Sequence, residues 1–296
     1  DTRTPVDVVL YAGMLVSMVL ALSGAMTRGE VAAVLVFLVL IGLRDQTIFL
    51  AARGEVYGSL MVTSLFVAGD QVTAAKLVMV TIWGGAAISK LNVHFPYVVS
   101  AMLSNSPMWR FGGLRTRFLH RNFPDDLRPA RLPATLAHSG TVVELIVPTV
   151  MLVSSGGWPL RLAAGRLIFL HLVILTSLPM GVPLEWNVFM IWGIVTLFLG
   201  NPGLHLGALA DPLLVAALVA LLVAMVVYGN LVPDKVSFLL SMRYYAGNWA
   251  ATFWCFKGDA LERFDRNVVK ASMLPHQQLE KVCGSAEEAE VPLFMG

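Results

Sequence analysis

The stretch Pro212–Leu231, PLLVAALVALLVAMVVYGNL, carries no charged side chain. A helix needs about 20 mostly apolar residues to cross the hydrocarbon core of a bilayer, and this stretch is long enough. Further apolar runs occur at Pro5–Leu22, Val31–Leu43, Val56–Gly69, Val72–Ile88, Thr141–Val153, Leu162–Leu178 and Val188–Leu199. We therefore predict an all-α, polytopic helical membrane protein with about eight transmembrane helices. The shorter runs have an alternative interpretation as buried or re-entrant helices.

The composition also favours a membrane protein. Of the 296 residues, 57% are hydrophobic and 14% are charged, whereas soluble domains carry about 25% charged residues. So few charges leave most of the surface facing something other than water. No basic stripe with interleaved aromatic residues is present, so we expect no nucleic-acid partner. The two cysteines, Cys255 and Cys283, lack the spacing of a metal site, and either reduced thiols or a disulfide would fit them.

The distribution of Lys and Arg predicts the orientation of the chain, because cytoplasmic loops are enriched in these residues. The polar loop 104–133 carries six arginines and two aspartates, so we expect it to be cytoplasmic. Counting spans outward then places both ends of the segment in the cytoplasm of a plasma (inner) membrane protein. We divide the chain into a transmembrane domain, 1–231, and a cytoplasmic C-terminal region, 232–296, that continues in a longer polypeptide.

Polar side chains inside or beside the apolar runs mark the candidate site, because such groups are costly in hydrocarbon. Lys90 and His94 lie four residues apart, so they would share one face if the helix continues past Lys90. A lysine in an apolar cavity can act as a base, and His94 or Asn92 would position the substrate. The alternative is that Lys90 extends to the headgroups at the membrane edge.

Two further polar groups lie inside predicted spans. His171, if neutral and buried, can ligate haem or a metal or hydrogen-bond a quinone carbonyl, and the alternative is a satisfied core histidine. Glu144 is costly unless it is protonated or paired. We expect it to have a partner such as Lys90, His171 or Arg166.

A predicted helix break at Pro179–Pro183 is followed at once by Glu185, Trp186 and Asn187. The ends of a broken helix can bind a polar ligand. The structural alternative is an interfacial tryptophan beside a glutamate that is favoured by the helix dipole.

Another candidate group follows the last predicted span, in Met242–Trp249. Arg243 and Tyr244 in this segment could close a pocket for a lipid headgroup or a cofactor. Aromatic residues with one arginine are also typical of the membrane interface, which is the structural alternative.

Three segments carry a resemblance to a known family. Trp83–Ser106, Pro179–Asn187 and Met242–Trp249 resemble an uncharacterised family of actinobacterial, largely mycobacterial, transmembrane proteins. The resemblance covers nearly the whole chain. It implies a longer full-length polypeptide and no established activity.

A more distant resemblance is to the HTTM superfamily, which includes the membrane domain of the vitamin-K-dependent carboxylase. It rests on Ala86–Asn92, followed by Phe95, and on the segment around His171. The resemblance implies that Lys90 is the base that deprotonates a reduced quinone or another lipid-soluble substrate. Asn92 stands where the superfamily usually has Asp, and Phe95 stands where it has Trp. No glutamate-substrate domain follows, so protein carboxylation is not expected.

Two functions follow from these patterns. The first is an HTTM-like enzyme or a binding protein for a lipid-soluble molecule, namely a quinone, an isoprenoid or an acyl lipid, with its cofactor left open. Its catalytic candidates are Lys90, His94 and His171, and its substrate-binding candidates are Asn92, Glu144, Glu185, Trp186, Asn187, Arg243 and Tyr244. The second is a non-catalytic membrane subunit of a lipid-export or cell-envelope assembly complex, with membrane lipids and other membrane subunits as partners.

Overall fold

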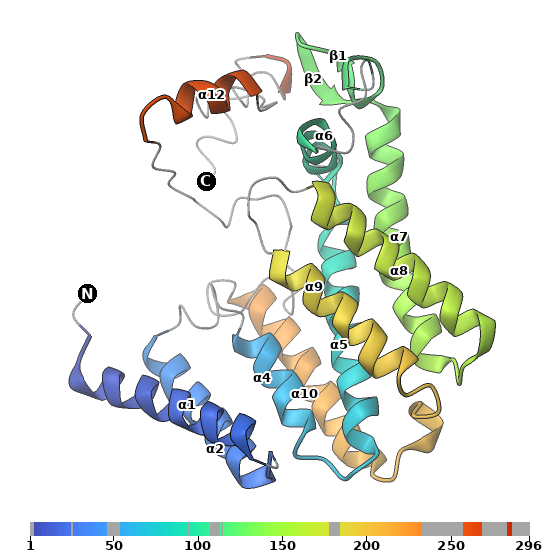
Figure 1. The fold of residues 1–296 in the computed structure, drawn as a ribbon. Coiled ribbons are helices and arrows are strands. Elements are labelled where there is room, and N and C mark those ends of the chain that lie inside the picture. Colours follow the sequence, from blue (N-terminus) through green and yellow to red (C-terminus); the bar gives the residue numbers. More distant parts are fainter. Residues whose placement is uncertain are drawn as a thin grey trace. The chain divides into compact units, whose positions relative to one another are not determined.

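A computed structural model describes residues 3–24, 26–45, 54–93, 95–106, 113, 115–177, 184–232, 257–267 and 283–285. In chain order, its elements are α1 (Pro5–Ser23), α2 (Arg28–Arg44), α4 (Gly54–Thr63), α5 (Asp70–Ser89), α6 (Phe95–Asn105), η2 (Arg115–Leu119), β1 (His120–Asn122), β2 (Asp126–Pro129), α7 (Arg131–Val153), α8 (Gly157–Ser177), α9 (Leu184–Gly193), η3 (Ile194–Leu199), η4 (Leu206–Ala208), α10 (Pro212–Leu231) and α12 (Ala260–Asn267) (Figure 1). Most of the described chain is helical, as predicted. The short β1–β2 hairpin departs from the all-α expectation.

Four described helices, α1, α5, α7 and α8, are long and apolar enough to cross a membrane. Shorter apolar helices cover 186–199 and 212–228. Each apolar run identified in the sequence contains a helix. The chain is therefore an integral, multi-pass membrane protein, and the count of about eight crossings stays a prediction.

The chain forms two compact units. Unit 1 consists of Asp1–Ser89, Glu144–Leu167 and Trp192–Arg243, and unit 2 consists of Lys90–Val143, Ile168–Ile191 and Tyr244–Gly296. Each unit thus collects segments that lie far apart in the sequence. The boundary proposed from composition, at residue 231, stays a prediction, because most of 232–296 lies outside the described residues.

Helix α5 is the core helix of unit 1. It packs against α4, α10 and η3, and its residues Val78, Met79 and Ile82 are fully buried. The ring centroids of Trp83 on α5 and Phe198 on η3 lie 6.2 Å apart. A helix that is apolar on all sides is stable only when it is surrounded by other helices or by lipid, and α5 has mainly helices around it.

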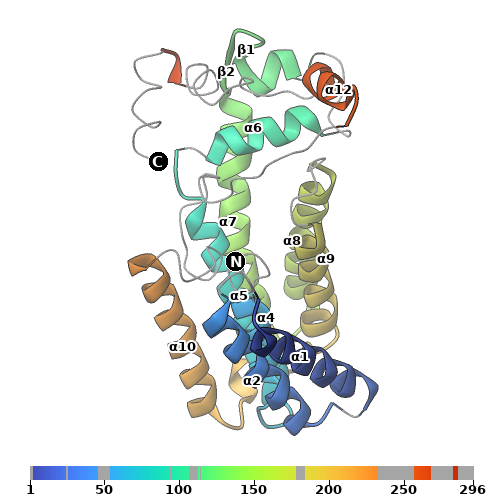
Figure 2. The same cartoon turned by 90° about the vertical axis from the view of Figure 1, so that its left-hand side faces the viewer.

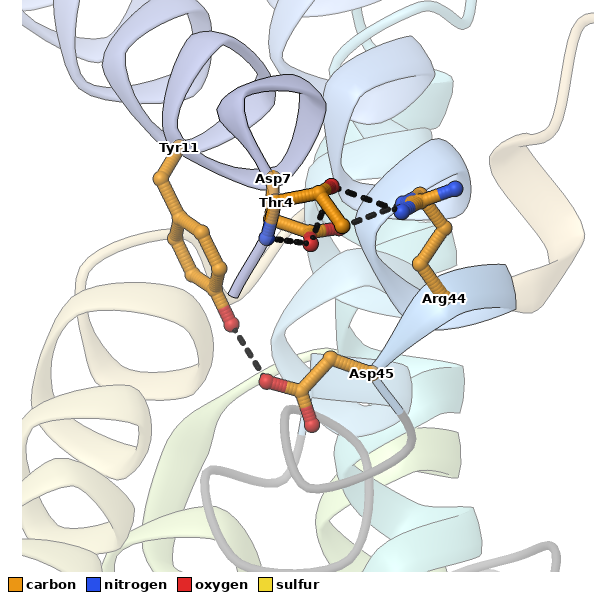
Figure 3. Close-up of polar contacts among 5 residues, drawn as sticks. All are labelled: Thr4, Asp7, Tyr11, Arg44 and Asp45. Atoms are coloured by element: carbon orange, nitrogen blue, oxygen red, sulfur yellow. Dashed lines mark hydrogen bonds and ion pairs between the residues drawn. The ribbon is translucent and has the colours of Figure 1, made fainter. Parts of the chain in front are cut away.

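Helices α1 and α2 form an antiparallel hairpin in unit 1, and α1 exposes most of its apolar side chains. A polar cluster ties the start of α1 to the end of α2 (Figure 3). Asp7 forms an ion pair with Arg44, which also donates to Thr4 Oγ1 at 3.0 Å. The Tyr11 hydroxyl donates to Asp45 at 2.8 Å. Because these bonds join the open ends of the hairpin, they fix how the two helices are aligned along their length.

Gly13 permits the close approach of α1 to α2. A Cβ at this position would lie 2.5 Å from Cε1 and Cζ of Phe37. We expect Gly13→Ala to lower the free energy of unfolding by about 1–3 kcal/mol, because overpacking forces two rigid helices apart. Thermal unfolding of the purified protein measures the effect, with Gly29→Ala on the open face of α2 as the control, since nothing lies within 4 Å of a Cβ there. Equal melting temperatures for the two variants would contradict this account of the helix contact.

Unit 2 contains a β-hairpin within residues 104–133, which were predicted to be a polar loop. Strands β1 and β2 pair antiparallel, with His120 opposite Pro129 and Asn122 opposite Asp126. Both η2 and β2 pack against α6, which lies across the direction of α7 at the end where α7 begins (Figures 1 and 2). Helix α7 starts at Arg131, so the described part of the predicted polar loop, 115–130, is a folded element that leads directly into a spanning helix.

Candidate functional site

Lys90 lies in a turn and not on a helix. Helix α5 ends at Ser89, whose hydroxyl donates to Ala86 O at 2.8 Å. Lys90 and His94 would share a helix face only if the helix continued past Lys90, and this condition is not met. Lys90 is half-buried, with its Nζ 5.7 Å from the centroid of the Phe95 ring. His94 lies outside the described residues.

The physical reason for the turn is the start of α6. The Phe95 N–H, at the beginning of α6, donates to Asn92 Oδ1 at 2.9 Å. Pro96 follows, and proline is tolerated in the first helical turn but not in a helix interior. Asn92, a predicted substrate ligand, therefore has a local structural role at the start of α6.

His171 on α8 and Asn187 on α9 form a buried hydrogen-bonded pair in unit 2. The distance from His171 Nδ1 to Asn187 Oδ1 is 2.9 Å, and the two residues are 2% and 4% exposed. Both were candidate site residues, and the structure brings them together across the helix break that the sequence predicts between α8 and α9. An amide oxygen can only accept, so Nδ1 carries the proton and donates it. In the neutral ring, Nε2 is then the basic nitrogen.

Trp186 lies beside this pair in the sequence and is also buried, with its ring centroid 6.1 Å from that of Phe189. This burial argues against the alternative of an interfacial tryptophan. The backbone of Glu185 lies in the first turn of α9, while its side chain is outside the described residues. Residues 178–183 and the candidates Arg243 and Tyr244 also lie outside the described part of the chain.

Glu144 is buried in α7, four residues before Pro148, which lies inside the same helix. It belongs to unit 1, whereas Lys90 and His171 belong to unit 2. The pairing of Glu144 with either residue therefore stays a prediction.

Two buried charges in unit 1, Lys76 and Asp70, were not among the predicted site residues. Lys76 on α5 is 2% exposed, and its ammonium donates to Asn201 O at 2.7 Å and to Leu204 O at 2.6 Å. The Nζ also lies 5.4 Å from the centroid of the Phe198 ring. The ammonium thus makes two hydrogen bonds and lies within cation–π distance of an aromatic ring. Lys76 is thus a structural residue that holds the segment before α10 against α5.

Asp70 acts on the same segment. Its carboxylate oxygens accept from Ala210 N at 2.8 Å and from Asp211 N at 2.7 Å. Asp211 in turn accepts from Leu214 N at 3.1 Å and caps the start of α10. The sequence does carry a signal for this arrangement. Asp70 and Lys76 are two opposite charges, six residues apart, at the start of an apolar run, and Asp211-Pro212 is a typical helix start further along the chain.

A buried histidine, His120, fastens the β1–β2 hairpin to α6 in unit 2. Its Nε2 lies 2.8 Å from Ser104 Oγ, and its Nδ1 lies 2.9 Å from Leu127 O and 3.3 Å from Ser100 Oγ. The two serines lie one helical turn apart on α6, so they present their hydroxyls on the same face. Sequence reasoning gave no reason to single out this histidine, because the loop appeared polar throughout.

Among the described residues, no group of three or more His, Cys, Asp or Glu side chains is placed to hold a metal ion. Cys283 is a free thiol, and Cys255 lies outside the described residues. Among the described candidate residues, His171 and Asn187 are joined by a hydrogen bond of 2.9 Å, and Trp186 is next to Asn187 in the chain. These three form the candidate site.

Comparison with known proteins yields one match. A family described as "Transmembrane protein of unknown function (DUF3556)" matches residues 1–296. No curated protein and no solved structure shows significant similarity to the chain. The family description agrees with the four apolar helices of spanning length and supplies no activity. Because the match extends over the whole of this sequence, the chain belongs to the DUF3556 family of transmembrane proteins.

Proposed function

We propose that this protein binds a lipid-soluble molecule with a hydroxyl or carbonyl group, such as a quinol, a quinone or an isoprenoid lipid, at the His171–Asn187 pair. The observation that supports this most directly is the buried hydrogen bond between the two side chains. Polar side chains inside membrane helices are costly, so pairs of this kind commonly mark ligand or proton sites.

The tautomer of His171 narrows the chemistry of the ligand. With Nδ1–H donating to Asn187, the basic Nε2 can accept a proton or a hydrogen bond from a hydroxyl. A quinol offers such a hydroxyl, whereas a quinone offers only carbonyl oxygens. We therefore propose the reduced form as the ligand, with the His171–Asn187 pair as its polar contact.

The finer form of the proposal is an HTTM-like enzyme in which Lys90 is the base, with His94 and His171 orienting the substrate. Its support is that Lys90, Asn92, His171 and Asn187 belong to one compact unit. The half-burial of Lys90 beside Phe95 also fits a partly enclosed ammonium. The proposal includes about eight crossings of the plasma membrane of an actinobacterium, with both ends of the segment cytoplasmic.

The test is the lipid that purifies with the protein. We expect wild-type protein, extracted into detergent, to retain a quinone or isoprenoid lipid that mass spectrometry detects in stoichiometric amount. His171→Leu and Asn187→Leu should each reduce this occupancy about tenfold or more, the equivalent of one lost hydrogen bond to a basic group. His138→Gln is the matched control, because His138 is an exposed histidine on α7 of the same unit.

Three outcomes separate the possibilities. Loss of the lipid in both variants, with normal thermal stability, supports a binding site. Unchanged lipid content with a lowered melting temperature would mean that the pair is purely structural. A wild-type protein that carries no lipid-soluble molecule would contradict the proposal outright.

The second candidate function is a non-catalytic membrane subunit of a lipid-export or envelope-assembly complex. It is favoured by unit 1, where the buried charges of Lys76 and Asp70 are satisfied by backbone groups of the same chain. Such charges serve packing and not ligand binding. Purification from native membranes in a mild detergent tests this candidate: it predicts stoichiometric co-purifying membrane subunits that persist in His171→Leu.

A further inference from the structure

Exposed arginines lie on the η2–β1 segment and at the start of α7. Arg117, Arg121 and Arg131 are exposed, and none of them forms an ion pair with any residue in the described part of the chain. Arg128 differs, because it binds both carboxylate oxygens of Asp126 at 2.8–3.1 Å. This bond lowers the pKa of Asp126. The charge of Arg128 is therefore balanced locally, whereas Arg117, Arg121 and Arg131 are exposed and form no ion pair with a described residue.

Exposed apolar side chains accompany these arginines. Phe118 is 48% exposed and Leu132 is 39% exposed, and the Arg117 guanidinium lies 6.0 Å from the centroid of the Phe118 ring. We call Arg117, Phe118, Arg121, Arg131 and Leu132 the basic face. Arginines with neighbouring exposed apolar side chains suit the boundary between headgroups and hydrocarbon, where each kind contacts the layer that it prefers.

The basic face is held in place and lies next to a spanning helix. His120 is anchored to α6 by Ser104 at 2.8 Å, and because β1 points His120 inward, the adjacent Arg121 points outward. The face ends at Arg131, the first residue of α7, which is long and apolar enough to cross the membrane. Helix α6 runs across α7 at this end, as an interfacial helix would (Figure 2). The connectivity thus places the basic face at a membrane surface.

We propose that the basic face binds the headgroups of anionic phospholipids. The positive charge of the basic face and its position at a membrane surface support this assignment. The arginine side chains complement phosphate groups, and Phe118 and Leu132 reach the upper acyl region. A nucleic acid would use the positive charge but would leave the apolar side chains in water, which makes the lipid surface the better partner.

The test compares lipids in a binding experiment on the full chain. Purified protein in a neutral detergent is titrated with phosphatidylglycerol or with phosphatidylcholine, and bound lipids are counted by native mass spectrometry. We expect a preference for phosphatidylglycerol that weakens as salt is raised. The double variant Arg117→Gln/Arg121→Gln should lose roughly tenfold or more of its affinity for phosphatidylglycerol, since each arginine near an anionic surface contributes severalfold.

The matched control is Arg263→Gln/Arg266→Gln. These two exposed arginines lie on α12 of the same unit, but they have the acidic neighbours Asp259 and Glu262. The control should keep the full preference, and both double variants should keep the wild-type melting temperature. Equal affinity for the two lipids, or an unchanged preference in Arg117→Gln/Arg121→Gln, would overturn the proposal. Complete displacement of the lipid by inorganic phosphate or by a short oligonucleotide would also overturn it, because the face would then bind a soluble anion.

Discussion

Replacing Lys76 with methionine should lower the free energy of unfolding by about 2–4 kcal/mol. The substitution keeps the length and apolar stem of the side chain and removes the ammonium that donates to Asn201 O and Leu204 O. Methionine offers no donor, so the two carbonyls lose charge-assisted hydrogen bonds worth about 1.5–3 kcal/mol each. Removing a buried charge also recovers part of its desolvation cost. The expected loss of unfolding free energy is therefore smaller than the sum of the two hydrogen-bond contributions.

The measurement is unfolding of the purified protein in detergent, by heat or by denaturant. Lys90→Met is the matched control, because Lys90 lies just beyond the end of the same helix and is only half-buried. We expect the control to change the free energy of unfolding by less than about 1 kcal/mol, as is usual for partly exposed positions. If Lys90→Met proved the more destabilising of the two, the assignment of a structural role to Lys76 would be wrong.

The two lysines also show what the sequence could and could not predict. The apolar runs predicted the helices well, and Pro212–Leu231 coincides with α10, because a long, mostly apolar run without a charge has few other stable conformations in a bilayer. Lys90 was a candidate because it lies in the local motif Ala86–Asn92, with His94 four residues further along. Lys76 was not, because its partners lie more than a hundred residues further along the chain, and local patterns carry no information about such contacts.

The same limit applies to the candidate site. The residues His171 and Asn187 were each predicted, since a polar group in an apolar run is visible in the sequence. That they bond to each other depends on how α8 and α9 pack, which the break between them does not specify. The predicted span Val72–Ile88 ends one residue before the end of α5 at Ser89, but whether the helix continues past Lys90 stayed open in the sequence. It does not continue, because Asn92 and Pro96 start a new helix.

Replacing Asp70 with asparagine should be nearly as destabilising as the loss of Lys76. The carboxylate accepts one hydrogen bond on each oxygen, from Ala210 N and Asp211 N. An asparagine of the same shape can accept one of them, but its amide group then turns a donor toward the other N–H. We expect the free energy of unfolding to fall by about 2–3 kcal/mol, because the hydrogen bond to the neutral acceptor is weaker and one N–H is left without a partner.

Asp211→Asn is the control for this prediction. Asp211 caps α10 by accepting from Leu214 N, and asparagine caps a helix about as well as aspartate does. Asp211→Asn makes the same change from carboxylate to amide as Asp70→Asn does. It should nevertheless leave the melting temperature almost unchanged. A comparable loss in both variants would mean that negative charge in this region, and not the geometry at Asp70, is what stabilises the fold.

The double variant Lys76→Met/Asp70→Asn tests whether the two charges act together. Both side chains hold the segment between η3 and α10 against α5. When one of the two attachments is lost, the segment becomes more mobile, so the remaining attachment stabilises the fold less. We expect the combined loss to fall short of the sum of the single losses by about 1 kcal/mol, within the usual range for residues that share a structural element. Strict additivity would show that the turn at Asn201–Leu204 and the start of α10 are anchored independently.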